Sequence, residues 1–443
     1  MPPTNLDKTL SAILSSRSSQ GRLRRLTIPS PASVDFSSNG YLSLSSHPAV
    51  KAAYLSLLAS HLQVQAHSAA AEPGCGLGSG GSRLLDGNSA FAEGLEAQIA
   101  GFHGAEAGLL FNSGFEANTG LFACVPQRGD VIVYDELIHA SVHDGMRLSR
   151  AQRIPFAHNQ VHDAAAAVKT SEQDGQDKGK YPSLDALLRT LTQGPQGEAV
   201  QSGKTNIFIA VEGIYSMDGD AAPLEQIAEC VEKNLPRGNG YIVVDEAHST
   251  GILGPQGRGL VCQLGLQDRI WARVHTFGKA MGCSGAIVLC SSTARNYLIN
   301  YARSFIYTTA MSFPSLASIR TTYNFLASGR ADPLISHLYF LIHHIHCLLA
   351  DIVRRQAPLP ELLHINPEVP QSPILPLFTN KARSLAQHCQ QKGFTVRPIV
   401  APTVPMGQDR VRVCLHAGNS VEEVEGLCRA VEEWVTHASR SKL

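Results

Sequence analysis

One stretch of this chain surrounds a single lysine and decides how the rest is interpreted: Val274-His275-Thr276-Phe277-Gly278-Lys279-Ala280-Met281-Gly282-Cys283-Ser284-Gly285-Ala286. Small and hydroxyl side chains flank Lys279, and a run typical of a buried strand follows it. Small neighbours let a flat ring approach, and a desolvated lysine loses its proton readily, which suits an amine that forms a Schiff base. Taken alone, a lysine in a glycine-rich loop is usually solvated, so a second signal is needed.

That second signal lies upstream, in Val243-Val244-Asp245-Glu246-Ala247-His248-Ser249-Thr250-Gly251. Its acid stands at the carboxyl end of a predicted strand, where open α/β sheets bind their ligands. An aspartate at that place could accept a hydrogen bond from a pyridine nitrogen, a charge-assisted contact of roughly 1.5 to 3 kcal/mol, and keep the ring cationic.

The chain around these two stretches alternates short apolar runs with longer amphipathic ones, which predicts a mostly parallel sheet covered by helices on both faces. The predicted strands are 108–111, 131–134, 207–211, 241–244 and 286–290. Residues 170–181 and 192–204 are polar and non-periodic, and we expect surface loops there. A hydrophobic helix over 334–354 and a Pro-rich connector over 357–376 lead into a smaller C-terminal αβ segment.

Composition excludes several classes of protein. The 37 basic and 37 acidic side chains cancel, so no overall field favours nucleic acid or an anionic membrane. The ten cysteines contain no CxxC pair, which predicts reduced intracellular thiols and no structural zinc. No apolar run approaches the ~18 residues of a membrane span, and the N-terminus does not begin a secretory signal, so we expect a soluble protein.

Three further motifs carry little weight. Gly76, Gly78 and Gly81 fit a dinucleotide fingerprint, but no strand precedes them. A Gly203-Lys204-Thr205 triplet imitates a nucleotide-binding loop, but a strand follows where a helix should start. The histidines at 343, 344 and 346 lack the i, i+4 spacing that suits a metal on a helix.

Taken together and in order, nine blocks carry a resemblance over nearly the whole chain. They are Asp35-Phe-Ser-Ser-Asn-Gly-Tyr-Leu, Gly80-Gly-Ser-Arg, Phe111-Asn-Ser-Gly-Phe-Glu-Ala-Asn, Ile138-His-Ala-Ser, Phe156-Ala-His-Asn, Glu212-Gly-Ile-Tyr-Ser-Met-Asp-Gly-Asp, the two stretches above and Pro402-Thr-Val-Pro. The sequence resembles the α-oxoamine synthases, a branch of the fold-type-I pyridoxal-phosphate enzymes, and most closely those that make 8-amino-7-oxononanoate for biotin.

The resemblance implies an α/β fold in which a large domain with a mostly parallel seven-stranded sheet is joined to a smaller C-terminal α+β domain. We expect an N-terminal arm over 1–50, a pyridoxal-phosphate-binding domain over 51–312 and a small domain over 313–440. It also implies a homodimer, because sites of this family lie between two subunits.

The same resemblance assigns the site residues. Lys279 would form the Schiff base with pyridoxal 5'-phosphate, Asp245 would hold the ring nitrogen, His248 the phenolic oxygen, and His139 would stack on the ring. The other cofactor contacts would come from Gly114, Phe115, Ser216, Thr276 and, toward the phosphate of the partner subunit, Thr309. Arg24, Asn39 and Thr403 match substrate-binding places. For the residues of the site that carry a hydroxyl, such as Ser216 and Thr403, an ordinary helix cap or turn is the alternative explanation.

One departure concerns the substrate carboxylate. The bacterial relatives typically have an arginine three residues before the threonine of the Pro-Thr-Val-Pro block, where this chain has Val400. A planar guanidinium suits a carboxylate, so its loss leaves open how that group is bound. Arg397 is displaced along the chain, and Arg410 and Arg412 match a family pair that could be structural.

The resemblance therefore implies a decarboxylative condensation of an amino acid, L-alanine above all, with an acyl-coenzyme A, pimeloyl-coenzyme A above all. A sister activity that makes 2-amino-3-oxobutyrate, 5-aminolevulinate or a specialised metabolite is the alternative. A catalytically silent subunit of a heterodimer is a further one, against which the presence of Lys279 and Asp245 argues.

The chain ends in Ser441-Lys442-Leu443, the tripeptide that a peroxisomal import receptor reads at a free C-terminus. The polar residues before it favour an exposed end. A rival signal is the N-terminus, where five basic residues face a single Asp7 among serines, as in mitochondrial presequences. We expect the peroxisomal address, with cytoplasm or mitochondrion as alternatives.

Overall fold

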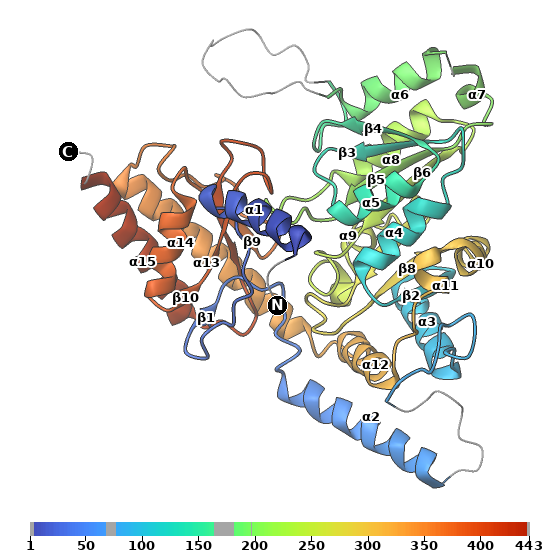
Figure 1. Ribbon diagram of the computed structural model, residues 1–443, viewed down its shortest axis with the longest axis horizontal. Helices are drawn as coiled ribbons and strands as arrows, with labels where there is room; N and C mark the ends of the chain where they lie inside the picture. Colours follow the sequence, from blue (N-terminus) through green and yellow to red (C-terminus); the bar gives the residue numbers. More distant parts are fainter. Residues whose placement is uncertain (1–3, 68–76, 164–180, 196, 441–443) are drawn as a thin grey trace.

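The computed structural model describes residues 4–67, 77–163, 181–195 and 197–440. Figure 1 shows a large domain built around a central sheet, a smaller domain formed by the C-terminal part of the chain, and an N-terminal segment that passes between them. The predicted loop over 170–181 lies almost wholly outside the described residues, as does the C-terminal tripeptide.

The large domain has a seven-stranded sheet in the order β2-β8-β7-β6-β5-β3-β4. Its strands are β2 (Ala107–Phe111), β3 (Val131–Asp135), β4 (Gln152–Phe156), β5 (Ile207–Glu212), β6 (Gly240–Asp245), β7 (Ala272–Thr276) and β8 (Ala286–Cys290). Only β8 runs against the others, because it pairs antiparallel with both β2 and β7. The mostly parallel sheet and the five strands predicted from sequence are confirmed, and β4 and β7 are added.

The strands are apolar on both faces because helices cover both. Along β5, Ile207 and Ile209 pack into one core, whereas Phe208 and Ala210 pack into the other. Successive side chains of a strand point to opposite faces, so a continuous apolar run is what a doubly covered sheet requires.

The helices of this domain fall into two layers. One layer includes α4 (Gly114–Cys124), α5 (Ala140–Leu148), α10 (Ser292–Tyr301) and α11 (Arg303–Ile306). The other includes α3 (Ala90–His103), α6 (Leu184–Gln193), α7 (Gly197–Gln201), α8 (Leu224–Asn234), α9 (Leu260–Gln263) and α12 (Phe313–Ala327), with a short 3₁₀ turn at Pro255–Gly257.

The small domain has a three-stranded antiparallel sheet in the order β11-β12-β9, formed by β9 (Ile374–Phe378), β11 (Arg397–Ile399) and β12 (Arg410–Cys414). Its helices are α13 (Asp332–Gln356), α14 (Ala382–Gln391) and α15 (Val421–Arg440), and α15 packs on the other two. A short strand, β10 (Phe394–Thr395), pairs in parallel with β1 (Val34–Asp35) and ties the N-terminal segment to this domain.

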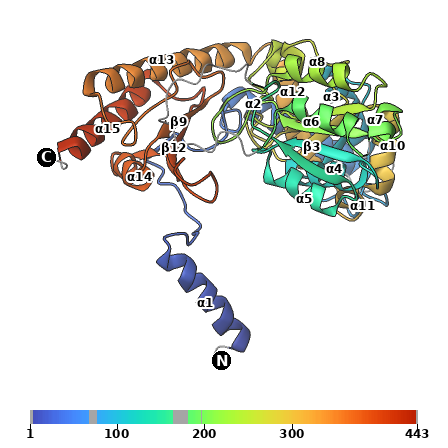
Figure 2. The ribbon, with the colours of Figure 1, turned by 90° about the horizontal axis from the view of Figure 1, so that it is seen from above.

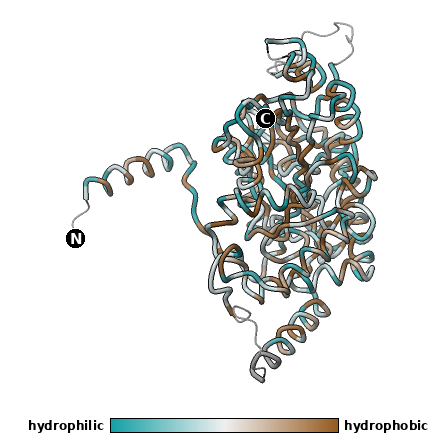
Figure 3. Tube along the Cα trace, turned by 90° about the vertical axis from the view of Figure 1, so that its right-hand side faces the viewer, coloured by the Kyte–Doolittle hydropathy of each residue, from teal (hydrophilic) through white to brown (hydrophobic). Residues whose placement is uncertain are grey.

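Two helices of the N-terminal region extend from the body. Helix α1 (Asn5–Ser19) buries none of its residues and stands clear of both domains in Figure 2. In Figure 3, α1 lies apart from the two domains and contains both polar and apolar residues. Helix α2 (Pro48–His67) packs against α12, and the ring of His61 stacks on that of Phe313.

The predicted small domain begins at residue 313, where α12 starts, and α12 packs on α2 and α3. The boundary between the two domains stays a prediction. The predicted loop over 192–204 contains α7, which forms because the side chain of Val200 is buried in the core.

By length and composition alone, helix α13 is long and apolar enough to cross a membrane. The sequence analysis predicted no such segment. Its buried residues include Leu338, Leu341 and Ile345, and the helix packs against α15. A core helix passes the same test, so this finding alone does not indicate a span.

Candidate active site

The carboxyl ends of the parallel strands meet at one edge of the sheet and present polar residues there. Strand β5 ends at Glu212 and β6 at Asp245, and these two residues are paired across the strands. Strand β7 ends at Thr276, three residues before Lys279, and β3 ends four residues before His139. The topology therefore gathers residues far apart in sequence at the edge where such sheets bind ligands.

A cavity of about 670 Å³ opens at this edge, between the two domains. Seven residues predicted for the site line it: Lys279, His139, His248, Ser216, Arg24, Asn39 and Thr403. The last of these comes from the small domain, and Asn39 from the segment between β1 and α2. The cavity is therefore complete only when the large domain, the small domain and the N-terminal segment come together.

The amine of Lys279 is poised to lose its proton. Burial lowers the pKa of this amine, while the carboxylates of Asp245 and Glu212 act in the opposite direction. Burial also raises the pKa of Glu212 well above its ordinary value, and the nearby charge of Asp245 adds to the effect. A neutral amine is the form that attacks a carbonyl carbon.

Asp245 lies next to the cavity and is held by two donors. Its Oδ2 accepts a hydrogen bond of 2.7 Å from Nδ2 of Asn118, and its Oδ1 accepts one of 2.9 Å from the backbone of Ala247. The same amide group of Asn118 donates to Oγ of Ser141 at 3.0 Å, and that hydroxyl lies 2.7 Å from Nδ1 of His139. The two predicted residues thus belong to one hydrogen-bonded chain.

Both predicted histidines are neutral at physiological pH. Burial lowers the pKa of His139, despite the opposing charge of Asp245. Burial lowers the pKa of His248 well below its usual range, and the positive charge of Lys279 acts in the same direction. His248 places Nδ1 2.8 Å from the hydroxyl of Tyr41.

The N-terminus of α4 offers an anion site beside these residues. Ser113 caps the helix by accepting a hydrogen bond from the backbone of Glu116. Gly114 packs so closely on Thr276 that a Cβ at residue 114 would lie 2.2 Å from Oγ1 of that threonine. Phe115 is 46% exposed. Free N–H groups and the helix dipole at such an end favour a phosphate.

Thr309 does not line the cavity that contains Lys279. Its carbonyl accepts a hydrogen bond of 2.8 Å from Asn112, and it borders a different hollow together with Arg83 and Phe305. The wall of the larger cavity does not include Gly114, Phe115, Thr276 or Thr309, all of which the structure describes. The predicted contact of Thr309 with a partner subunit stays a prediction.

The cavity contains arginines even though residue 400, typically an arginine in the bacterial relatives, is a valine in this chain. Val400 packs against the apolar core, and Arg397 donates to Thr27 at 3.2 Å. Arg410 and Arg412 both line the cavity. Arg410 is paired with Asp218, but no carboxylate of the described residues lies within ion-pair distance of Arg412.

Three residues of the site were not selected from the sequence: Glu212, Tyr41 and Arg412. Each stands within or beside a block that carried the resemblance, or in the Arg-x-Arg pair. Glu212 ends its strand as Asp245 does, and this parallel could have revealed it. In the sequence, Tyr41 has the pattern of an ordinary buried aromatic residue, and nothing in its local pattern predicts its contact with His248.

The site has the features needed by a ring that carries an aldehyde, a basic nitrogen and an anionic group. Lys279 supplies the amine, Asp245 the carboxylate, and the end of α4 the anion site. Within the described residues, the buried atoms Oε1 of Glu212 and Oδ1 of Asn118 have no hydrogen-bond partner. Unpartnered buried atoms beside a reactive amine are typical of a site that a bound group completes.

Comparisons with known proteins agree with this arrangement. Residues 32–431 match the model of the family "Aminotransferase class I and II". The chain is 50% identical to 8-amino-7-oxononanoate synthase of Emericella nidulans, over 95% of this chain and 93% of that protein. It is 38% identical to the aminoacyl transferase sphA of Aspergillus fumigatus, over 89% of this chain and 79% of that protein.

Solved structures share the fold. Serine palmitoyltransferase of Sphingomonas wittichii superposes with a TM-score of 0.76 at 23% identity, covering 99% of both chains. The 8-amino-7-oxononanoate synthase of Francisella tularensis superposes with a TM-score of 0.66 at 22% identity, covering 93% of this chain and all of that one (100%). At these identities the likeness bears on the fold alone.

Proposed function

The chain belongs to the class I and II aminotransferase family and is a pyridoxal-phosphate-dependent acyltransferase, and we propose that it condenses L-alanine with pimeloyl-coenzyme A to give 8-amino-7-oxononanoate, coenzyme A and carbon dioxide. The observation that carries the proposal is the cavity lined by Lys279 and both histidines, where burial lowers the pKa of Lys279 and the charge of Asp245 lies close enough to act on it. The 50% identity to a fungal 8-amino-7-oxononanoate synthase supports the substrates.

Pyridoxal 5'-phosphate fits the residues at the strand ends. Lys279 would hold its aldehyde carbon, Asp245 its ring nitrogen, and the end of α4 at Gly114 its phosphate. When bound, the cofactor supplies an electron sink for a carbanion at the α-carbon of the amino acid. Two fixed donors, the side-chain amide of Asn118 and the backbone N–H of Ala247, orient the carboxylate of Asp245 for that role.

Lys279 has a second task once the amino acid replaces it. Its freed amine, with a pKa lowered by burial, takes the α-proton as general base and later returns a proton to the product. His139 and His248 are neutral, so neither repels the cation that Lys279 becomes. The two histidines therefore add no positive charge of their own beside Lys279.

Arg412 is the residue we assign to the carboxylate of the amino acid. It is buried, lines the cavity and lacks a carboxylate partner among the described residues. A bound carboxylate would neutralise its charge, and a guanidinium fork suits such a group. This assignment explains how the chain can dispense with an arginine at Val400.

The homodimer belongs to the same proposal. Thr309 does not line the cavity of its own chain, which fits a residue that completes a second copy of the site. Tyr307 beside it is 71% exposed, and a second subunit would cover such a ring.

Coenzyme A release, measured with a thiol reagent across several acyl donors and with alanine, glycine or serine, tests the reaction. We expect the highest kcat/KM for pimeloyl-coenzyme A with alanine. Strict preference for acetyl or succinyl donors would instead indicate one of the sister synthases. A purified protein without visible absorbance and without turnover would indicate a silent subunit.

We also propose that the protein is addressed to peroxisomes by Ser441-Lys442-Leu443. The proposal is supported by helix α15, which runs to Arg440 and ends at the edge of the small domain in Figure 1. The tripeptide follows this end directly.

A further inference from the structure

Tyr41 and His248 form a buried pair at the edge of the cavity. Tyr41 is fully buried (0% exposed), and its hydroxyl lies 2.8 Å from Nδ1 of His248. A neutral imidazole carries one proton on one of its two nitrogens. If Nδ1 accepts the hydrogen bond from Tyr41, the ring proton is on Nε2, which is then a donor. If Nδ1 donates, Nε2 is an acceptor.

The other neighbours of the hydroxyl show which way its proton points. Nη2 of Arg412 approaches it at 3.5 Å and can only donate. Oδ1 of Asn39 lies 3.2 Å away and already accepts a hydrogen bond of 3.0 Å from Arg412. Nδ1 of His248 is the nearer acceptor and has no other described partner. The single proton of Tyr41 thus belongs on the bond to Nδ1.

We propose that Tyr41 is a positioning residue that fixes His248 in the tautomer with its proton on Nε2. His248 forms part of the cavity wall, and no described residue accepts a hydrogen bond from its Nε2. The histidine therefore presents an N–H donor to the cavity. Resting on the proposed function, this donor would serve the phenolic oxygen of the cofactor.

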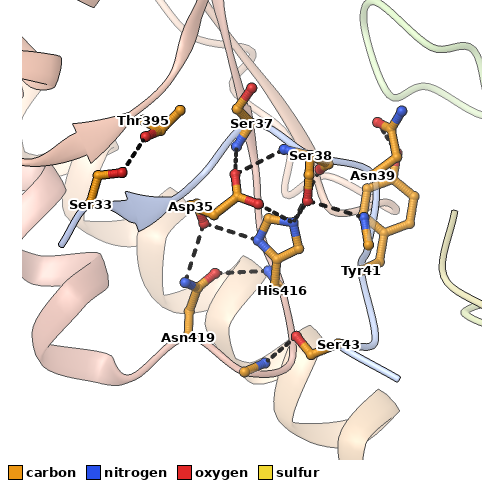
Figure 4. Close-up of polar contacts among 12 residues, drawn as sticks. Ser33, Asp35, Ser37, Ser38, Asn39, Tyr41, Ser43, Thr395, His416 and Asn419 are labelled. Atoms are coloured by element: carbon orange, nitrogen blue, oxygen red, sulfur yellow. Dashed lines mark hydrogen bonds and ion pairs between the residues drawn. The ribbon is translucent and has the colours of Figure 1, made fainter. Parts of the chain in front are cut away.

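The segment that carries Tyr41 is fixed by the small domain. Nδ1 of His416 lies 3.0 Å from the carbonyl oxygen of Asp35, and Ser38 lies 2.9 Å from Nε2 of the same histidine. Figure 4 shows these contacts gathered around His416, with Tyr41 farther along the same loop. Nε of Arg412 also donates to the carbonyl of Ser216 at 2.7 Å. The tautomer of His248 therefore depends on residues from the small domain and the N-terminal segment.

The direct test is nitrogen NMR of protein labelled with ¹⁵N-histidine, in which protonated and bare ring nitrogens differ strongly in shift. A His248→Gln sample identifies the signals of this residue. We expect a bare Nδ1 and a protonated Nε2 in the wild-type protein. A proton on Nδ1 would overturn the proposal, and this outcome depends neither on the substrates nor on turnover.

The second test compares Tyr41→Phe with Tyr323→Phe. Tyr323 is a matched control because it is also buried (1% exposed) and its hydroxyl lies 3.1 Å from Nε2 of His103, which does not line the cavity. We expect Tyr41→Phe to give mixed tautomers of His248, to shift the visible band of the loaded enzyme and to lower kcat about tenfold, with the KM for the amino acid little changed.

Tyr323→Phe should leave the tautomer and the visible band unchanged, even where it lowers the melting temperature as much as Tyr41→Phe does. Unchanged tautomer and band in Tyr41→Phe would contradict the proposal. If that variant does not fold, the wild-type measurement decides by itself. Failure of the proposed condensation with every donor, combined with a protonated Nε2, would reject the function and leave the inference standing.

Discussion

The side-chain amide of Asn118 donates a hydrogen bond of 2.7 Å to the carboxylate of Asp245. This bond joins helix α4 to the end of strand β6, so the helix whose N-terminus offers the anion site also orients the carboxylate. One helix thereby fixes the relative position of two groups that a cofactor would touch at opposite ends.

The charge of Asp245 is the first feature to test. Asp245→Asn keeps the shape but loses the charge, so we expect the affinity for pyridoxal phosphate and kcat each to fall about 10- to 100-fold, equivalent to the roughly 1.5 to 3 kcal/mol of a charged hydrogen bond. Equilibrium dialysis and steady-state kinetics measure the two effects. The exposed Asp268→Asn serves as control, and an unimpaired Asp245→Asn enzyme would contradict the role.

Removal of the amine at residue 279 should abolish the colour of the protein. Lys279→Ala leaves no group that can bind the aldehyde covalently, so we expect loss of the visible band and of at least 1,000-fold in kcat, on the order of what a lost catalytic nucleophile or base costs. The absorbance spectrum of the dialysed protein is the measurement. Lys204→Ala, at the surface, should remain yellow; a yellow Lys279→Ala protein after dialysis would refute the Schiff base.

The close packing of Gly114 on Thr276 predicts a steric effect. Gly114→Ala places a Cβ 2.2 Å from Oγ1 of Thr276, and we expect a loss of about 1 to 3 kcal/mol in stability together with weaker phosphate binding. Urea unfolding of the apoprotein and cofactor titration measure the two effects.

Gly101→Ala is the control for that substitution, because no atom lies within 4 Å of a Cβ there. Residue 101 lies within helix α3, so alanine should be neutral or stabilise the protein by up to about 1 kcal/mol. Adding Thr276→Ala to Gly114→Ala should restore stability, and absence of any such rescue would locate the strain elsewhere.

The raised pKa of His158 leads to a prediction of how the free energy of unfolding depends on pH. It lies 2.8 Å from both Asp135 and Asp220. Burial acts against its charge, but the bonds to the two carboxylates raise its pKa from 6.5 to about 10. Because the folded-state pKa is the higher one, this contribution to stability is complete below about pH 6.5 and disappears as pH rises through about 10.

His158→Gln should therefore be less stable than the wild type by about 2 kcal/mol at pH 6, with a difference that shrinks toward pH 10. Urea unfolding at a series of pH values measures it. A difference for His158→Gln that stays constant from pH 6 to 10 would exclude a charged histidine.

Deletion of residues 441–443 tests the proposed address. We expect an N-terminally tagged protein that ends at Arg440 to remain in the cytosol while the full-length protein enters peroxisomes, as fluorescence microscopy can show. Organelle localisation that survives this deletion but is lost without residues 4–19 would favour the N-terminal alternative. Helix α1 in that region buries no residue.

Much of the fold followed from local pattern. Strands such as β5 and β6 are continuous apolar runs that only a doubly covered sheet can bury, so their position was predictable to within one or two residues. Helix α7 was missed because its five residues have no helical period, and the burial of Val200 stabilises it instead.

The sequence by itself predicted Lys279 as the reactive amine and Asp245 as its acid partner, because each stands beside a strand that its own apolar run predicts. The reaction class came from the resemblance of nine sequence blocks to a known family. Only the tertiary structure decided which other residues join them. Tyr41 meets His248 across 207 positions of the chain, and Arg412 reaches Ser216 across 196. Such contacts arise where two domains and the N-terminal segment pack together, and no local pattern encodes a hydrogen bond between groups that only packing brings within reach.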